Sequence, residues 1–162
     1  MFKDDVPILI THISSGSGEH WCEQVTIEPG EYGNEDGSTP LVTGMCGDAI
    51  TTGGTFKITR KMEPKDDPDG DGWRKGALGE MYRPVYWNYG LAIHGSAKVP
   101  NENLSHGCIR LPMHVAKYFP ELVQKGDDIY VFDGVKVPEA YGHQPPPIDQ
   151  PDPNYVPTAG GG

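Results

Sequence analysis

Glycine and proline interrupt this chain so often that they exclude long helices. The 162 residues include 22 glycines and 16 prolines. Such a composition favours short strands joined by turns. Alternating apolar and polar residues predict strands at 21–28 and 55–60, and a largely apolar run predicts a buried strand at 6–14. The sequence therefore predicts a mostly β fold.

One helical pattern lies late in the chain. Apolar residues recur at helical spacing between 115 and 123, after a helix start at Leu111-Pro112. Pro120 should break or restart this helix, and Gly126 should end it before a closing strand at 128–132. We expect residues 1–137 to form one domain. Residues 138–162 are rich in proline and glycine without apolar periodicity, which is typical of a tail or linker.

The charge and hydropathy of the chain exclude several classes of partner. The formal net charge is −10, which argues against nucleic acid or an anionic membrane as partner. No apolar run approaches the length needed to span a bilayer. Residues 2–5 do not resemble a signal peptide. If the native protein is exported, we therefore expect this chain to be a piece of it.

The strongest chemical signal is the stretch Ser105–Arg110, which reads Ser-His-Gly-Cys-Ile-Arg. It brings Cys108 close to His106, and His94 lies a short way upstream. A thiolate is the reactive form of cysteine, and a neighbouring imidazole can accept the thiol proton. Gly107 permits a sharp turn that aims a backbone N–H at a developing oxyanion. This pattern favours a thiol nucleophile.

Two other interpretations of these residues remain open from the residue chemistry. Cys108 could be a packing residue, with His94 and His106 as structural hydrogen-bonding groups. The three side chains are also all types that bind zinc. However, the Cys-x2–4-Cys pairing found in many structural zinc sites is absent.

Two further segments carry candidate functions. The segment 79–89 is rich in aromatic residues, which either pack in the core or line a cleft. The segment 67–72 copies the first positions of a calcium loop. Leu78 stands where a bidentate Glu is needed, so we expect a solvated acidic loop.

The chain has three cysteines. An odd number in an exported protein suggests one disulfide and one free thiol. Cys22 and Cys46 would form that disulfide, closing a loop of about 25 residues. The alternative is that both are buried reduced thiols.

The histidine and cysteine motifs together resemble the signature of the L,D-transpeptidase catalytic domain, the YkuD-type family. The resemblance rests on His94-Gly95-Ser96 followed by Ser105–Arg110. Three weaker flanking matches agree with the family pattern. These are Ser14-Ser15-Gly16, residues 51–58 (with Thr52 where proline is usual) and residues 126–131. The resemblance covers residues 6–133.

The resemblance implies a fold and a set of site residues. The fold would be a β-sandwich or mixed sheet with a short helix after the catalytic cysteine. Cys108 would be the nucleophile and His94 its base, with the carbonyl of Gly95 orienting the imidazole. His106 would support the site, and backbone N–H groups near Gly107 and Cys108 would form the oxyanion hole. Candidate substrate contacts are Ser96, Ser105, Arg110, Tyr82, Trp87 and Tyr89.

The resemblance also implies a reaction on peptidoglycan stem peptides. Cys108 would attack a tetrapeptide stem and release D-Ala, and a side-chain amine of a second stem would then form a 3→3 cross-link. With water as acceptor the same scaffold is a carboxypeptidase, or an amidase that releases wall-linked proteins. An inactive peptidoglycan-binding module is the remaining alternative. Carbapenems are the implied inhibitors, and no metal or organic cofactor is expected.

Two departures from the family pattern are visible. The loop between His94 and Cys108 looks shorter than in many members, and a strand that usually precedes residue 6 is not evident. The family implies a site outside the cytoplasmic membrane, in the periplasm or the cell wall. That compartment favours the Cys22–Cys46 disulfide.

Overall fold

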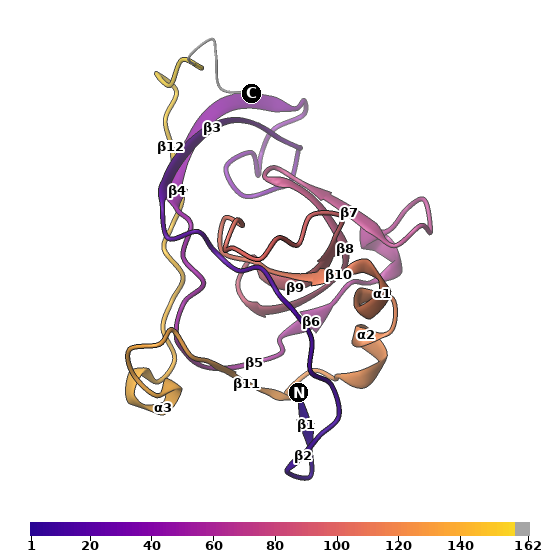
Figure 1. The fold of residues 1–162 in the computed structure, drawn as a ribbon. Helices are drawn as coiled ribbons and strands as arrows, with labels where there is room; N and C mark the ends of the chain where they lie inside the picture. Colours follow the sequence, from indigo (N-terminus) through magenta and orange to yellow (C-terminus); the bar gives the residue numbers. More distant parts are fainter. Residues whose placement is uncertain (158–162) are drawn as a thin grey trace.

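The computed structural model describes residues 1–157 and has the mostly β fold that the sequence predicts, with short helices (Figure 1). Its central sheet follows the order β10-β9-β8-β6, and β7 also pairs with β8. The strands of this sheet are β6 (Arg60–Lys61), β7 (Trp73–Gly76), β8 (Gly79–Asn88), β9 (Leu91–Ser96) and β10 (Ile109–Pro112).

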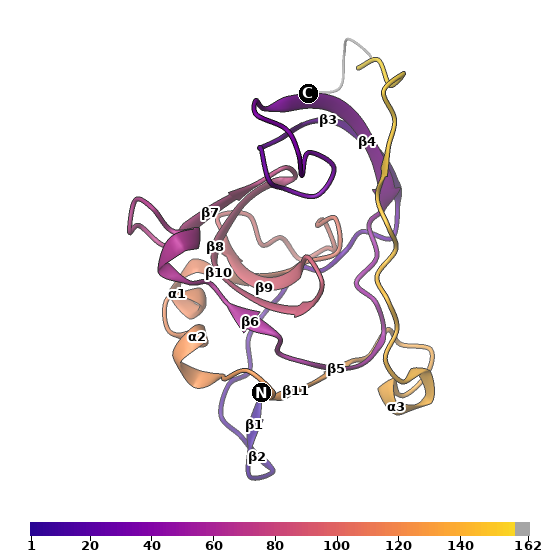
Figure 2. The same ribbon diagram turned by 180° about the vertical axis from the view of Figure 1, so that it is seen from behind.

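Three smaller sheets surround the central one. A long antiparallel pair arches over one end of the molecule, and an antiparallel pair and an N-terminal hairpin lie toward the other end (Figures 1 and 2). The arch is made of β3 (His20–Ile27) and β4 (Leu41–Asp48), with β12 (Gln150–Pro151) added on β4. The other pairs are β5 (Gly54–Lys57) with β11 (Asp128–Val131), and β1 (Phe2–Lys3) with β2 (Val6–Pro7).

Strand β10 runs parallel to β9, with Ile109 opposite Ile93 and Pro112 opposite Ser96. Parallel neighbours need a crossover of about a dozen residues or more. Here the crossover is the segment 97–108, which contains no regular element. Its last residue is Cys108, so the pairing of β10 with β9 fixes where the crossover loop delivers this side chain.

The late helical pattern forms two separate turns instead of one helix. They are α1 (Met113–Ala116) and α2 (Phe119–Leu122), with Pro120 in the first turn of α2. The prediction that Pro120 restarts the helix is confirmed, because proline is tolerated in a first turn but not in a helix interior. Both turns contribute to the main core, whose buried members are Ile58, Val85, Leu111, Val115, Ala116, Phe119 and Val123.

The remaining helical elements are the 3-10 turn η1 (Pro64–Asp66) and α3 (Pro138–Tyr141). A search of the described residues for a helix with the length and apolar character of a membrane span finds none.

The predicted buried strand at 6–14 is wrong. Only Val6 and Pro7 are in a strand, and Ile10 is 89% exposed. Apolar composition suggested a strand, but the segment between Pro7 and Ser14 has no strand beside it in the described structure. Ser14 alone makes a single bridge, to Arg110. Strands β7 and β10 were not predicted, because residues 73–76 directly follow the acidic segment 67–72 and Leu111-Pro112 was interpreted as a helix start.

The C-terminal segment follows the outside of the molecule from α3 to β4 (Figures 1 and 2). The Asn88 amide donates to the carbonyl of Gln144 at 3.0 Å, and the Asp152 N–H donates to Gly44 at 2.8 Å. Beyond these bonds, β12 pairs with β4 at Cys46 and Met45. The proline-rich tail is therefore held along the β3–β4 arch.

The packing of β5 on β8 predicts a large stability difference between two phenylalanines. Phe56 is 3% exposed and meets the Trp87 ring edge-on at 4.6 Å, whereas Phe132 is 64% exposed. Phe56→Ala should lower the free energy of unfolding by about 3–5 kcal/mol, because it leaves a cavity. Phe132→Ala should change it by less than about 0.5 kcal/mol. Urea denaturation of both variants tests this, and equal losses would contradict the assigned core.

Candidate active site

The loop before Cys108 turns at a glycine that no other residue can replace without strain. Gly107 has a φ of +132°, and a Cβ there would lie 2.8 Å from the carbonyl oxygen of Ile50. Both the backbone angle and the close approach disfavour any side chain. Gly95 is confined differently, since a Cβ there would lie 2.7 Å from the Cβ of Ala116. The absence of a side chain at Gly95 lets α1 pack directly against β9.

Two buried or half-buried hydroxyl groups hold the cysteine loop. Ser105 Oγ donates to the Cys108 carbonyl at 2.5 Å and accepts the Gly107 N–H at 3.0 Å. Thr51 Oγ1 donates to the Gly107 carbonyl at 2.7 Å and accepts the Gly16 N–H at 2.8 Å. Ser105 was predicted to bind substrate, but it is 3% exposed and anchors the loop instead. Because the Gly107 N–H is engaged by Ser105, only the Cys108 N–H remains of the two predicted oxyanion donors.

The early Ser14-Ser15-Gly16 segment docks against the same loop. Ser14 and Arg110 exchange two backbone hydrogen bonds, at 2.8 and 3.2 Å, and the Ser105 N–H donates to the Ser15 carbonyl at 3.0 Å. The segments around residues 14–16 and 51, which sequence reasoning treated only as weak family matches, are therefore the supports of the cysteine loop. Their serine and threonine hydroxyls were a signal that the sequence contained but that was not recognised.

His94 is buried on β9, with 6% of its surface exposed. Its Nδ1 lies 2.9 Å from the carbonyl oxygen of Gly95. A carbonyl only accepts hydrogen bonds, so Nδ1 carries the proton and the lone pair is on Nε2. Burial lowers the pKa of His94, the bond to Gly95 opposes this shift, and the Arg110 cation adds to it. The imidazole is therefore neutral at pH 7 and available as a base.

The register of the parallel strands sets Cys108 beside this histidine. Arg110 lies opposite His94, which leaves Cys108 at the level of Ala92. The Ala92 N–H donates to Cys108 Sγ at 3.5 Å. Residues two apart on a strand share a face, so Cys108, Arg110 and His94 face the same side of the sheet. In the part of the chain that the structure describes, no hydrogen bond joins the His94 ring to the Cys108 thiol.

Burial raises the pKa of the Cys108 thiol, while the bond from Ala92 and the Arg110 cation lower it less strongly. The resting pair is therefore a neutral thiol and a neutral imidazole. Catalytic hydrogen bonds are often long without substrate and tighten in the complex, so the geometry is compatible with proton transfer between these groups.

His106 lies apart from this pair. Its Nε2 is 2.8 Å from Glu23 Oε1, and its ring meets the Trp21 ring edge-on at 4.6 Å. It therefore connects the cysteine loop to β3. Among the described residues, the donor atoms of His94, His106 and Cys108 do not gather as metal ligands do. The alternative of a zinc site at these three residues thus has no geometric support.

The predicted aromatic contacts separate into different environments. Trp87 is 1% exposed and packs on Phe56, so the prediction that it contacts substrate is not supported. Tyr89 is 77% exposed at the turn between β8 and β9. Tyr82 is half-buried and reaches Gly95, where a Cβ would lie 3.0 Å from its ring. Gly95 alternates with His94 along β9, so Tyr82 packs with Ala116 on the face of the sheet opposite to the His94 side chain.

The predicted polar contacts also differ in their surroundings. Ser96 is half-buried at the end of β9, and its hydroxyl accepts the N–H of Lys98 at 3.2 Å. Arg110 is half-buried opposite His94. Both therefore lie beside the histidine, where a substrate group could reach them.

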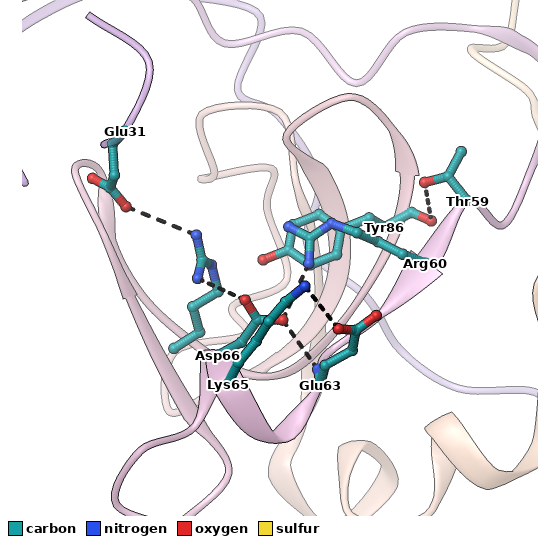
Figure 3. Close-up of polar contacts among 8 residues, drawn as sticks. Glu31, Thr59, Arg60, Glu63, Lys65, Asp66 and Tyr86 are labelled. Carbon is teal, nitrogen blue, oxygen red and sulfur yellow. Dashed lines mark hydrogen bonds and ion pairs between the residues drawn. The ribbon is translucent and has the colours of Figure 1, made fainter. Parts of the chain in front are cut away.

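A charged cluster lies over the strands on the β6 side of the central sheet (Figure 3). Asp66 accepts hydrogen bonds from Arg60 at 3.4 Å and from Arg74 at 3.3 Å. The Arg60 guanidinium lies 3.6 Å from the centre of the Tyr86 ring, and Tyr86 pairs with Ala92 across the sheet. Burial raises the pKa of Tyr86. The cluster joins β6, η1, β7 and β8, and keeps Tyr86 in the same row as Ala92.

Cys22 and Cys46 are joined by a disulfide in the structure. They lie directly opposite each other on β3 and β4. Cys108 is the free cysteine.

The model of the YkuD family, described as the L,D-transpeptidase catalytic domain, matches residues 1–131. The chain belongs to this family. Its fold resembles the L,D-transpeptidase (residues 123–326) of Xylanimonas cellulosilytica, with 24% identity, a TM-score of 0.56, and coverage of 81% of this chain and 53% of that one. An L,D-transpeptidase from Mycobacterium smegmatis matches with 22% identity, a TM-score of 0.38, and coverage of 60% and 51%.

This L,D-transpeptidase-family chain thus spans about half the length of the solved chains that it matches. No curated protein matches it.

Two adjacent threonines test the anchoring of the cysteine loop. Thr51→Val removes a hydroxyl that joins Gly16 to Gly107, so two backbone groups lose their partner. The free energy of unfolding should fall by about 1–3 kcal/mol. Thr52 is the matched control, because its buried hydroxyl has no partner among the described residues. Thr52→Val should be neutral or stabilising, and equal losses in urea denaturation would contradict the anchoring role.

Proposed function

We propose that this chain catalyses acyl transfer between peptidoglycan stem peptides, with Cys108 as nucleophile, and forms 3→3 cross-links. The observation that supports this most strongly is the shared face of Cys108 and His94, with the Nδ1 of His94 bonded to the Gly95 carbonyl. Membership of the L,D-transpeptidase family supports the same chemistry. The proposed substrate is a tetrapeptide stem, and the proposed product is the 3→3 cross-link.

In the first step, Cys108 Sγ attacks the carbonyl carbon that precedes the terminal D-Ala of a tetrapeptide stem. The thiol proton passes to Nε2 of His94, and the carbonyl oxygen becomes an oxyanion near the Cys108 N–H. The C–N bond then breaks, and D-Ala leaves with the proton that His94 held. The stem remains on Cys108 as a thioester.

In the second step, a side-chain amine of an acceptor stem attacks the thioester. His94 accepts a proton from the amine and returns it to the sulfur as the C–S bond breaks. The products are a new amide and the free thiol. Water in place of the amine gives carboxypeptidase activity, so exclusion of water decides the outcome.

Arg110 is the residue best placed to tune this pair. It lies opposite His94 in the parallel ladder, and its cation lowers the pKa of both His94 and Cys108. The lower pKa of Cys108 favours the thiolate that attacks, whereas the lower pKa of His94 makes the imidazole a weaker proton acceptor, so the two shifts act in opposite directions on the proton transfer. Arg110 also offers a partner for a stem carboxylate.

The same proposal includes a location and an inhibitor class. The Cys22–Cys46 disulfide supports an oxidising compartment outside the cytoplasmic membrane. Carbapenems present a strained amide carbonyl. Attack of the Cys108 thiol on this carbonyl would leave Cys108 acylated, as attack on a stem peptide does.

Two histidine variants test the assignment of the base. His94→Ala should slow D-Ala release from a tetrapeptide stem by about 10²–10⁴-fold, the range for loss of a general base. His106→Ala is the matched control, because His106 bonds to Glu23 and should affect the rate far less. Release of D-Ala and formation of dimers are measured by mass spectrometry. A larger loss in His106→Ala than in His94→Ala would contradict the assignment.

The pKa shifts predict the pH profile of the reaction. His94 acts as a base only when neutral, and its pKa is below the ordinary 6.5, so activity should rise with pH through a midpoint below 6.5. The pKa of Cys108 is above the ordinary 9.0, so activity should stay level from about 6.5 to 9. The ultraviolet absorbance of the thiolate, taken as wild type minus Cys108→Ala, should likewise appear above pH 9. A thiolate already present at pH 7 would contradict the neutral resting pair.

A further inference from the structure

Four side chains that can bind metals form a square on the outer face of the β3–β4 arch. His20 lies directly opposite Asp48, and Cys22 lies directly opposite Cys46. Residues two apart on a strand project to the same side, so all four share one face. Val25 and Ile27, at odd positions, are buried on the other side.

The opposite face of the arch is the one that meets the candidate active site. Trp21 and Glu23 contact His106 there. The square therefore lies on the far side of the arch from Cys108, and the mechanism proposed above does not use it.

The donor atoms of three of these residues already lie at the separations of metal ligands. His20 Nε2 and the sulfurs of Cys22 and Cys46 are within 4.8 Å of one another. Nε2 lies 3.8 Å from Cys22 Sγ. Zinc–nitrogen and zinc–sulfur bonds in a tetrahedral site place such atoms about 3.6 Å apart. Small side-chain movements would therefore bring this nitrogen and sulfur to one ion.

The fourth residue orients the histidine. Asp48 Oδ1 lies 2.9 Å from His20 Nδ1. A carboxylate accepts the Nδ1 proton, which leaves the lone pair on Nε2 and directs it to the sulfurs. Carboxylates hold the histidines of zinc sites in this way.

We propose that, when the Cys22–Cys46 disulfide is reduced, His20, Cys22 and Cys46 bind a thiophilic divalent cation such as Zn²⁺, with Asp48 positioning His20. A dithiol reductant supplies two electrons and two protons to the S–S bond and is itself oxidised to a disulfide. The metal displaces the two thiol protons to solvent, and two metal–sulfur bonds and one metal–nitrogen bond form. Water completes the coordination.

The site is open to both the reductant and the metal. The His20 side chain is 66% exposed and that of Asp48 is 54% exposed. Both cysteines are half-buried. The arch would then be cross-linked in either redox state, by the disulfide when oxidised and by the metal when reduced.

Cobalt is the probe for this site, because thiolate–cobalt bonds give a charge-transfer absorption. The full chain carries Cys108→Ala, so that Cys22 and Cys46 are its remaining thiols. After reduction with a phosphine, we expect one Co²⁺ per chain with thiolate absorption, and displacement of this absorption by Zn²⁺. The oxidised chain should give no such absorption. A reduced chain that develops no thiolate–cobalt absorption would overturn the proposal.

Two further variants, made in the same Cys108→Ala background, distinguish Co²⁺ binding at this site from non-specific Co²⁺ binding. His20→Ala should weaken Co²⁺ binding at least about tenfold, and Asp48→Asn should weaken it about tenfold by releasing His20. His114→Ala is the matched control, since His114 is an exposed histidine on α1. It should leave Co²⁺ binding unchanged. Equal affinity in the His20 and His114 variants would overturn the proposal.

Metal binding can still be tested if the chain unfolds when the disulfide is reduced. If the reduced chain loses its far-ultraviolet circular dichroism signal, Zn²⁺ should restore it, since metal binding then supplies folding free energy. Failure of Zn²⁺ to restore the signal would count against the site.

Discussion

The site depends on the parallel pairing of β10 with β9. This short ladder sets Arg110 opposite His94 and leaves Cys108 at the level of Ala92. A slip of one residue would turn Cys108 to the other face of the sheet. The register is held from outside the ladder as well, because Ser14 exchanges two hydrogen bonds with Arg110 on the far edge of β10. The relative position of the thiol and the imidazole is thus a property of the whole sheet.

The loop that leads into β10 is fixed by polar groups instead of apolar packing. Ser105 accepts the N–H of Gly107, and Thr51 donates to its carbonyl. Such buried hydrogen bonds are costly to break, because each loss leaves a backbone group with neither a protein partner nor water. The same burial keeps Cys108 and His94 neutral at rest. A rigid and neutral pair is consistent with a nucleophile that ionises only when a substrate carbonyl is present.

The family could be predicted from the sequence more fully than the packing could. The spacing of His94 and Cys108 indicated the family, and the alternation at 21–28 and 55–60 indicated strands that exist with small shifts. An apolar run does not reveal its pairing partners, however, so the segment at 6–14 was predicted as one strand although, in the described structure, only Val6 and Pro7 of it belong to a strand. The four residues of β10 are too few to show a period. Trp87 was a candidate substrate contact because it stands in an aromatic-rich segment, and composition alone does not distinguish a core residue from one that lines a cleft; the structure buries it.

The central claim is that Cys108 is a reactive and correctly placed nucleophile. The most direct test is the intact mass of the protein after incubation with a carbapenem, for the wild type and for Cys108→Ala. The account predicts a single adduct on the wild type and none on the variant. A folded wild-type protein that remains unmodified, or a variant that is modified equally, would contradict it.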